Sequence, residues 1–386
     1  MNSIELFSGC GGLALGLARA GFEHRLMVEW NNDAVSTVLH NKAREIDHVK
    51  HWPIVKEDVR SIDWARYSKN LVLAAGGPPC QPFSIGGKHG GAGDDRDMWP
   101  QAVRAVGETS PEGFIFENVK GLTRPKFASY LKWIVAALSR PSLRREPKES
   151  LSSHLIRLEA SRRPLEYRVK VVKVNAADYG APQKRHRVII AGIRADSGLE
   201  LSEFVPTHSR ERLLWDQWVT GSYWKRHGRD MPSIKAIPRM DRAMVAKLKQ
   251  AGMEPWGSPW VTVRDALLGL GEPNGRNNHM RQDGAKVYAG HTGCPLDQPA
   301  KALKAGDHGV PGGENMMVLD SGKVRYFTMR EAARLQGLPD DYEFPSSWTE
   351  SMRQLGNAVP AQLSEAVGHW IRGHLVEARR SRRAAA

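Results

Sequence analysis

The sequence predicts an α/β protein: a first domain with a doubly wound, largely parallel sheet, and a second, smaller domain rich in loops. In residues 1–196, short apolar runs with strand character alternate with helical stretches, which is the pattern of parallel strands joined by crossover helices. Residues 197–325 hold no period for long, and their prolines, glycines and tryptophans are scattered among basic residues. Helical patterning returns in residues 326–386, and we expect a terminal helix over 359–379 to pack back on the first domain.

Each expected strand of the first domain is a short apolar run. The six runs are residues 4–7, 25–29, 71–75, 113–117, 167–174 and 188–193. A glycine-rich turn follows the first run and leads into a helical stretch over 13–20. Residues 139–165 interrupt the alternation with a basic turn and an amphipathic helix over 149–163. We interpret them as a surface insertion, and a second phosphate-contacting surface is the alternative.

Composition favours a polyanionic partner. The chain of 386 residues has 56 basic and 42 acidic residues and a net charge of +14, which suits binding to phosphate without identifying the partner. No run of about 18 apolar residues predicts a membrane helix, and the first residues lack a signal core, so we expect a cytoplasmic protein. Cys10, Cys80 and Cys294 are widely spaced and form no C-x-x-C pair, so we expect neither a disulfide framework nor a metal site.

The first candidate ligand site is the turn after residues 4–7. Gly9 and Gly11 would let the backbone approach a ligand, and the helix that follows offers unpaired N–H groups. Glu29 lies about 20 residues further on, at the end of the next strand, where a carboxylate can bind a ribose hydroxyl. Trp30 could stack on an adenine ring or could be a buried core residue. These features are compatible with NAD, FAD or S-adenosylmethionine, and also with a purely structural turn.

The second candidate site follows the expected strand over 71–75. The run Gly76-Gly77-Pro78-Pro79-Cys80 places a cysteine at the carboxyl end of the sheet, where doubly wound folds have their active sites. Two prolines fix the backbone immediately before Cys80, which favours a nucleophile over a core residue.

Six sequence blocks stand in a fixed order along the chain. They are the glycine turn at 6–14, Pro-Cys-Gln-Pro-Phe-Ser at 79–84, Phe-Glu-Asn-Val at 116–119, Gln-Lys-Arg-His-Arg at 183–187, Arg-Glu-Ala-Ala-Arg-Leu-Gln-Gly at 330–337 and Gln-Leu-Gly-Asn-Ala-Val-Pro at 354–360. This set resembles the DNA (cytosine-5) methyltransferase family, of the bacterial restriction-modification type. The match covers about residues 1–196 and 325–375, and six ordered blocks argue against coincidence.

The resemblance implies an S-adenosylmethionine-dependent methyltransferase domain (Rossmann-like) over 1–196, a target recognition domain over 197–325, and double-stranded DNA as the partner. The implied catalytic residues are Cys80, Glu117, Arg185 and Arg187. The implied cofactor-binding residues are Phe7, Gly9, Gly11, Glu29, Trp30, Asp58, Pro78 and Asn357, and the implied DNA-binding residues are Gln81, Ser84 and Lys88. We expect a monomer, with a cognate restriction endonuclease acting on the same site.

The family mechanism gives these residues their roles. The Cys80 thiolate adds to carbon 6 of cytosine and makes carbon 5 nucleophilic toward a methyl sulfonium. Glu117, protonated in a closed pocket, donates to ring nitrogen 3. Arg187 holds the ring carbonyl oxygen, while Arg185 orients the site or the phosphate. Asp58 accepts a hydrogen bond from the adenine amino group, and the target base is flipped out of the duplex.

Two positions depart from the family pattern, and one segment has an unusual composition. Trp99 stands where the family usually has an aliphatic residue, and Ala302-Leu303 is the counterpart of a Thr-aliphatic pair. Glycines crowd residues 81–99, so we expect a loop that closes over DNA and controls access to Cys80.

Three other functions are compatible with parts of the sequence. A tRNA cytosine-5 methyltransferase of the same family would carry a Cys-Phe-Thr tripeptide, and none occurs here. An NAD-dependent oxidoreductase would explain the glycine turn, but it would leave Cys80 and Glu117 without roles. A catalytically inactive DNA-binding regulator is disfavoured because both of these residues are intact.

Overall fold

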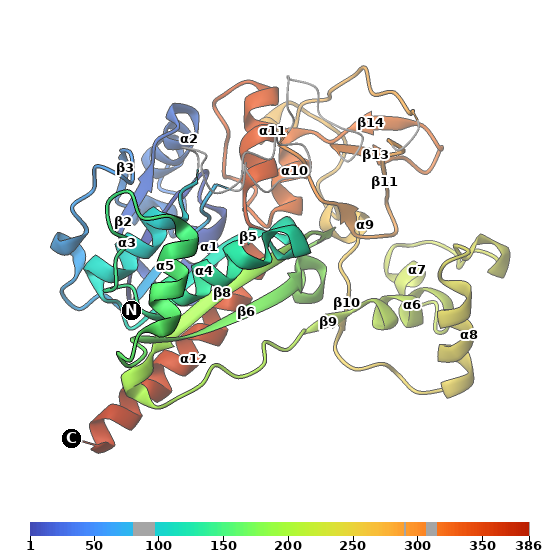
Figure 1. Cartoon of the computed structure of the whole chain (residues 1–386). Coiled ribbons are helices and arrows are strands. Elements are labelled where there is room, and N and C mark those ends of the chain that lie inside the picture. The colour runs from blue at the N-terminus through green and yellow to red at the C-terminus, as the bar shows by residue number, and fades with distance from the viewer. Residues whose placement is uncertain (80–96, 289–290, 306–314, 386) are drawn as a thin grey trace.

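The structure is a computed structural model, and it describes residues 1–79, 97–288, 291–305 and 315–385. Among these residues a seven-stranded sheet in the order β3-β2-β1-β4-β5-β8-β6 forms the centre (Figure 1). The strands are β1 (Asn2–Leu6), β2 (Glu23–Glu29), β3 (Ile54–Lys56), β4 (Leu73–Gly76), β5 (Gly113–Val119), β6 (Tyr167–Asn175) and β8 (His186–Arg194). The first five strands in this order run parallel, and β8 is antiparallel to both of its neighbours.

Helices cover both faces of this sheet because its strands alternate apolar side chains between the two sides. Phe114 and Phe116 of β5 point to the face covered by α3 and α4. Ile115 points to the opposite face, which α1 and α12 cover. The helices of this part are α1 (Gly12–Arg19), α2 (Asn32–Ala43), α3 (Trp99–Thr109), α4 (Ala128–Ser139), α5 (Leu151–Ala160) and α12 (Ala361–Ala385).

Two glycines let the terminal helix lie directly on the first one. A Cβ atom on Gly16 would lie 2.3 Å from the Cβ of Ser364, and one on Gly368 would lie 2.6 Å from the Cβ of Ala20. Side chains at these positions would force the helices apart. The terminal helix α12 therefore lies directly against α1.

The sheet has its topological switch point at β1. One crossover leads from β1 to β2 on one side, while β4 and then β5 follow on the other side. In doubly wound folds this arrangement opens a crevice outside the carboxyl ends of the strands. Phe7 to Gly12 follow β1 there, and Gly77 to Pro79 follow β4.

The described part of residues 197–325 falls into two packed regions. The first is a helical lobe with a core of its own, in which Leu213, Tyr223 and Val245 are buried. Its elements are α6 (Arg210–Trp218), α7 (Ser222–Arg226) and α8 (Arg242–Ala251), with the short strands β9 (His208–Ser209) and β10 (Ser258–Pro259) at its base.

The second region shares its core with the closing segment and with α1. Val263, Cys294 and Leu335 belong to one buried cluster together with Ala14. The elements are α9 (Val263–Ala266), β11 (Cys294–Pro295), β12 (Ala300–Lys301), β13 (Met316–Val318), β14 (Val324–Tyr326), α10 (Met329–Leu335) and α11 (Trp348–Asn357). β12 pairs with β7 (Gln183–Lys184), so the chain crosses back to the first domain there.

All six expected strands occur, and the doubly wound fold class is confirmed. The strand β3 at the sheet edge was not predicted, since three residues are too few to show a period. The helices α6 and α8, whose apolar residues pack into the separate core of the helical lobe, were not predicted either. Among the described residues, no helix is both long and apolar enough to cross a membrane.

Candidate active site

The glycine turn after β1 is held by the carboxylate of Glu29. The backbone N–H of Gly9 donates to Oε2 of Glu29 at 2.8 Å, and that of Asn31 donates to Oε1 at 2.8 Å. Phe7, Gly9 and Gly11 all have positive φ angles, of 59°, 53° and 84°, which turns the backbone sharply toward α1. A Cβ on Gly9 would meet no atom of the described residues within 4 Å, so among these residues the turn opens onto free space.

Trp30 directly follows β2, and Asp58 lies two residues after the end of β3. Trp30 is 70% exposed, so its interpretation as a buried core residue is wrong. Arg60 lies against Asp58, with its Nε donating to both carboxylate oxygens at 3.0 Å and lowering the pKa of that carboxyl. β2 pairs with β3 in register from Met27 to Glu29, so both side chains leave the same edge of the sheet.

Asn357 reaches this region from the far end of the chain. It ends α11 and is exposed. The next residues lie against the first turn of α1, because a Cβ on Gly12 would come 2.4 Å from the carbonyl oxygen of Val359. The structure thus brings the predicted cofactor residues from β1, β2 and α11 to one side of the crevice.

Glu117 and Arg187 form an ion pair on the other side of the crevice. Glu117 lies near the end of β5 and is 8% exposed, and Arg187 projects from the neighbouring strand β8. Nε of Arg187 lies 2.5 Å from Oε1 of Glu117. The second carboxylate oxygen faces the segment that leads to Cys80, since Oε2 lies 3.6 Å from a Cβ built on Gly77.

Asn118 fixes the backbone of that same segment. Its Nδ2 donates to the carbonyl oxygen of Pro78 at 3.0 Å, while its Oδ1 accepts from the N–H of Val119 at 2.9 Å. This residue is buried, with 1% exposure. No role was predicted for Asn118 from the sequence, although its position directly after the catalytic candidate Glu117 was the available signal.

Arg185 is a buried link between distant segments. It is 1% exposed, and its Nη1 donates to the carbonyl oxygen of Leu303 at 3.0 Å, while Nη2 donates to that of Gly356 at 2.6 Å. Leu303 belongs to the predicted counterpart of the Thr-aliphatic pair, and Gly356 precedes Asn357. Of the two roles expected for Arg185, this geometry favours orienting the site.

Four predicted residues, Cys80, Gln81, Ser84 and Lys88, lie outside the described residues, as does most of the expected loop over 81–99. The other two cysteines are buried, with Cys10 1% exposed and Cys294 fully buried. Burial raises the pKa of the Cys10 thiol to about 12, which disqualifies it as a nucleophile near neutral pH. No three His, Cys, Asp or Glu side chains gather into a metal-binding group within the described ranges.

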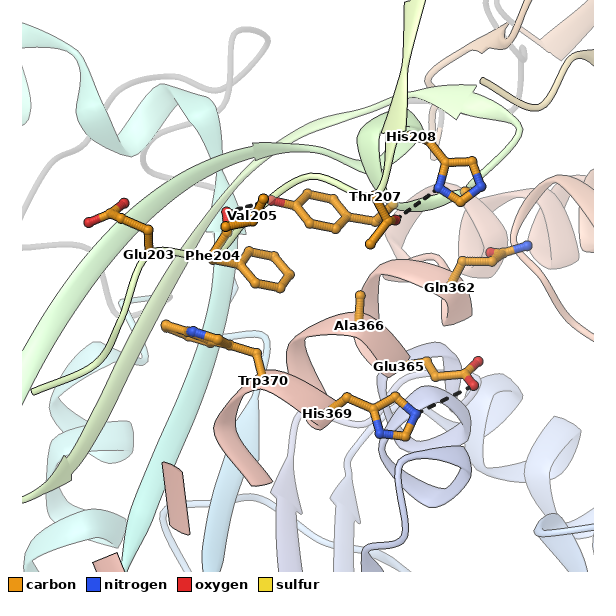
Figure 2. Close-up of a pocket in the computed structure, with 12 residues that line it drawn as sticks. Glu203, Phe204, Val205, Thr207, His208, Gln362, Glu365, Ala366, His369 and Trp370 are labelled. Carbon is orange, nitrogen blue, oxygen red and sulfur yellow. Dashed lines mark hydrogen bonds and ion pairs between the residues drawn. The ribbon is translucent and has the colours of Figure 1, made fainter. Parts of the chain in front are cut away.

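A groove of about 670 Å³ lies elsewhere, between α12 and residues 203–208 (Figure 2). Phe204 stacks on Tyr179 with ring centroids 4.3 Å apart and contacts Trp370 at 5.2 Å. None of the predicted site residues lines this groove, so we assign it no part in the chemistry of the crevice.

The sheet order, with a glycine turn after β1 and a carboxylate–arginine pair on β5 and β8, is that of an α/β methyltransferase. A family model described as C-5 cytosine-specific DNA methylase matches residues 1–141 and 155–372. The chain belongs to this family of enzymes, which confirms the predicted resemblance and rules out an oxidoreductase.

Named relatives extend along nearly the whole chain. The type II methyltransferase M.NgoMIV of Neisseria gonorrhoeae is 29% identical over 374 residues, 96% of each chain. The type II methyltransferase M.PspPI of Psychrobacter sp. (strain TA137) is 29% identical, over 95% of this chain and 78% of its own. Among solved structures, S. pombe Dnmt2 has a TM-score of 0.55 at 16% identity and 98% coverage of both chains. Entamoeba histolytica EhMeth has a TM-score of 0.53 at 15% identity. At such identities the two structures show the shared fold alone.

Proposed function

We propose that this chain transfers a methyl group from S-adenosylmethionine to carbon 5 of a flipped cytosine in double-stranded DNA, with Cys80 as the nucleophile. The observation that carries this proposal is the cluster at the ends of β4, β5 and β8. Glu117 pairs with Arg187 there, and the neighbouring Asn118 holds the carbonyl of Pro78, two residues before Cys80. The family membership supplies the reaction class.

The opposite side of the crevice suits S-adenosylmethionine. Open space lies above Gly9, and Glu29 retains lone pairs for ribose hydroxyls while it holds the turn. The exposed indole of Trp30 is free to stack on a purine. Asp58 supplies an acceptor for the adenine amino group, and Phe7, Gly11, Pro78 and Asn357 line the remaining walls by resemblance. When bound, this cofactor supplies an electrophilic methyl group.

The residues of the chain perform the rest of the reaction. The Cys80 thiolate forms a bond to carbon 6, and Glu117 delivers a proton to ring nitrogen 3, so that carbon 5 gains electron density. Arg187 holds both Glu117 and the ring carbonyl oxygen. After methylation, a base takes the proton at carbon 5, the ring double bond re-forms, Cys80 leaves as thiolate, and ring nitrogen 3 returns its proton to Glu117. Gln81, Ser84 and Lys88 would contact the DNA backbone beside the extruded base.

We further infer that residues 197–325 select the DNA sequence, since they contain none of the catalytic blocks. The relatives carry type II names, which supports a cognate restriction endonuclease with the same target. We expect a monomer acting in the bacterial cytoplasm, where its DNA substrate lies. Exchange of this region between relatives should move the target sequence, read by bisulfite sequencing of host DNA.

The test of the mechanism is trapping on DNA that contains 5-fluorocytosine, because fluorine at carbon 5 prevents the final elimination. Wild type should form a covalent adduct on a denaturing gel, and Cys80→Ala should form none while retaining its affinity for S-adenosylhomocysteine. Cys294→Ala is the matched control, and it should still form the adduct because Cys294 is buried away from solvent. Turnover by Cys80→Ala would overturn the mechanism. Methyl transfer to tRNA in place of DNA would refute the proposal that DNA is the substrate.

A further inference from the structure

A buried chain of hydrogen bonds and stacked rings runs from the insertion to the N-terminus of α3. The family match omits residues 142–154, which belong to the insertion. His154 from α5 accepts a hydrogen bond at Nδ1 from Nε1 of Trp133 at 3.1 Å, and its Nε2 donates to the carbonyl oxygen of Leu143 at 2.8 Å. His154 and Trp133 are each 2% exposed. The insertion is therefore packed into the domain and does not lie loosely on its surface.

Tyr130 connects Trp133 with Asp97. The rings of Trp133 and Tyr130 are stacked, with centroids 5.6 Å apart and planes at 28°. The hydroxyl of Tyr130 donates to Oδ1 of Asp97 at 2.5 Å, and the same oxygen accepts from the N–H of Trp99 at 3.1 Å. Burial and the Asp97 charge raise the pKa of Tyr130, so the hydroxyl remains a donor.

Asp97 lies between the chain segment of the proposed nucleophile and helix α3. It is the first described residue after the segment that begins with Cys80, and it fixes the entry into α3. Trp99 is fully buried and packs edge-on against Phe116, with centroids 5.9 Å apart. Phe116 directly precedes Glu117 on β5. One contact chain thus connects the insertion with both the chain segment of the nucleophile and the strand of the proton donor.

We propose that Tyr130 is a positioning residue for methyl transfer and that the insertion sets its ring through His154 and Trp133. Tyr130 touches neither substrate nor cofactor in this assignment. It acts by holding Asp97, and hence the point at which α3 begins. This inference rests on the proposed function, and it adds a device that the family's own blocks do not contain.

The test compares Tyr130→Phe with Tyr167→Phe. Both tyrosines are buried, and Tyr167 donates to the carbonyl oxygen of Pro111 at 2.7 Å, so each variant loses one buried hydrogen bond. Tyr130→Phe keeps the stacked ring and should lower kcat about tenfold, as expected for a lost hydrogen bond to a charged group, with KM for DNA unchanged. Tyr167→Phe should lose stability without losing kcat. His154→Phe should also lower kcat, by less than Tyr130→Phe does, and should leave KM for DNA unchanged.

Two results would overturn the proposal: a wild-type kcat for Tyr130→Phe, or equal losses of kcat in both tyrosine variants. A wild-type protein that transfers no methyl group to DNA would overturn the proposed function instead. In that case hydrogen exchange of the Trp99 amide decides the positioning role. Tyr130→Phe should accelerate that exchange, Tyr167→Phe should not, and equal exchange in both variants would refute it.

Discussion

Replacing Arg185 with methionine should lower the free energy of unfolding by about 2–4 kcal/mol. The guanidinium is buried and donates to the carbonyl oxygens of Leu303 and Gly356. Methionine preserves the length of the side chain but leaves two buried acceptors without donors, at a cost of roughly 1–3 kcal/mol each. Removing a buried charge offsets part of this loss, because the desolvation of the guanidinium opposes folding.

Urea unfolding followed by tryptophan fluorescence measures this effect, and Arg185→Lys is the matched control. A lysine ammonium keeps the charge but lacks the planar fork that spans two carbonyls, so its loss should be intermediate. Methyl transfer is measured at a temperature at which all variants are folded. If Arg185→Met kept the wild-type unfolding curve and lost only kcat, Arg185 would act on the substrate, and its interpretation as a link between segments would fail.

Three further outcomes are expected. Burial lowers the pKa of His24 from 6.5 to about 4, so the unfolded chain binds more protons in this window. Stability should therefore fall by about 3 kcal/mol as the pH drops from 6.5 to 4, and His24→Gln should flatten the pH profile of urea unfolding. Glu29→Ala should weaken S-adenosylhomocysteine binding by about 0.5–3 kcal/mol in calorimetry, and unchanged affinity would contradict the proposed cofactor site. Gly16→Ala should lower the melting temperature because its Cβ meets α12. Gly373 lies on α12, and a Cβ there would meet no described atom within 4 Å, so Gly373→Ala should raise the melting temperature slightly.

The parts of the fold that depend on local pattern could be predicted from the sequence. The apolar runs at β1, β2, β5 and β8 are long enough to be recognised as strands from the sequence. The turn at Gly9 could be predicted because glycine readily adopts a positive φ angle. The exposure of Trp30 could not be predicted, because an indole beside a strand end is compatible with a core position and with a ligand site. Only the tertiary structure, which leaves this indole 70% exposed, decides between them.

Contacts between distant segments could not be predicted either. The partners of Arg185 lie 118 and 171 residues further along the chain, and no periodicity encodes such a distance. The same holds for Tyr130 and Asp97, which are 33 residues apart in sequence and in contact through the tertiary fold. Family blocks indicated which residues matter, but they did not indicate which side chains hold others in place.

If residues 197–325 select the DNA sequence, as proposed, the short segment from Gln183 to Arg187 couples that selection to catalysis. Gln183 donates to the carbonyl oxygen of Leu335 in the closing segment at 2.7 Å. The backbone of Gln183 and Lys184 pairs with β12, within residues 197–325, while Arg185 donates to Leu303 and Gly356 and Arg187 pairs with Glu117. This segment of five residues thus contacts three parts of the molecule: the closing segment, residues 197–325 and β5. Because such a segment cannot move at one end and stay fixed at the other, a displacement of β12 must be accommodated by the same residues that set the Glu117–Arg187 pair.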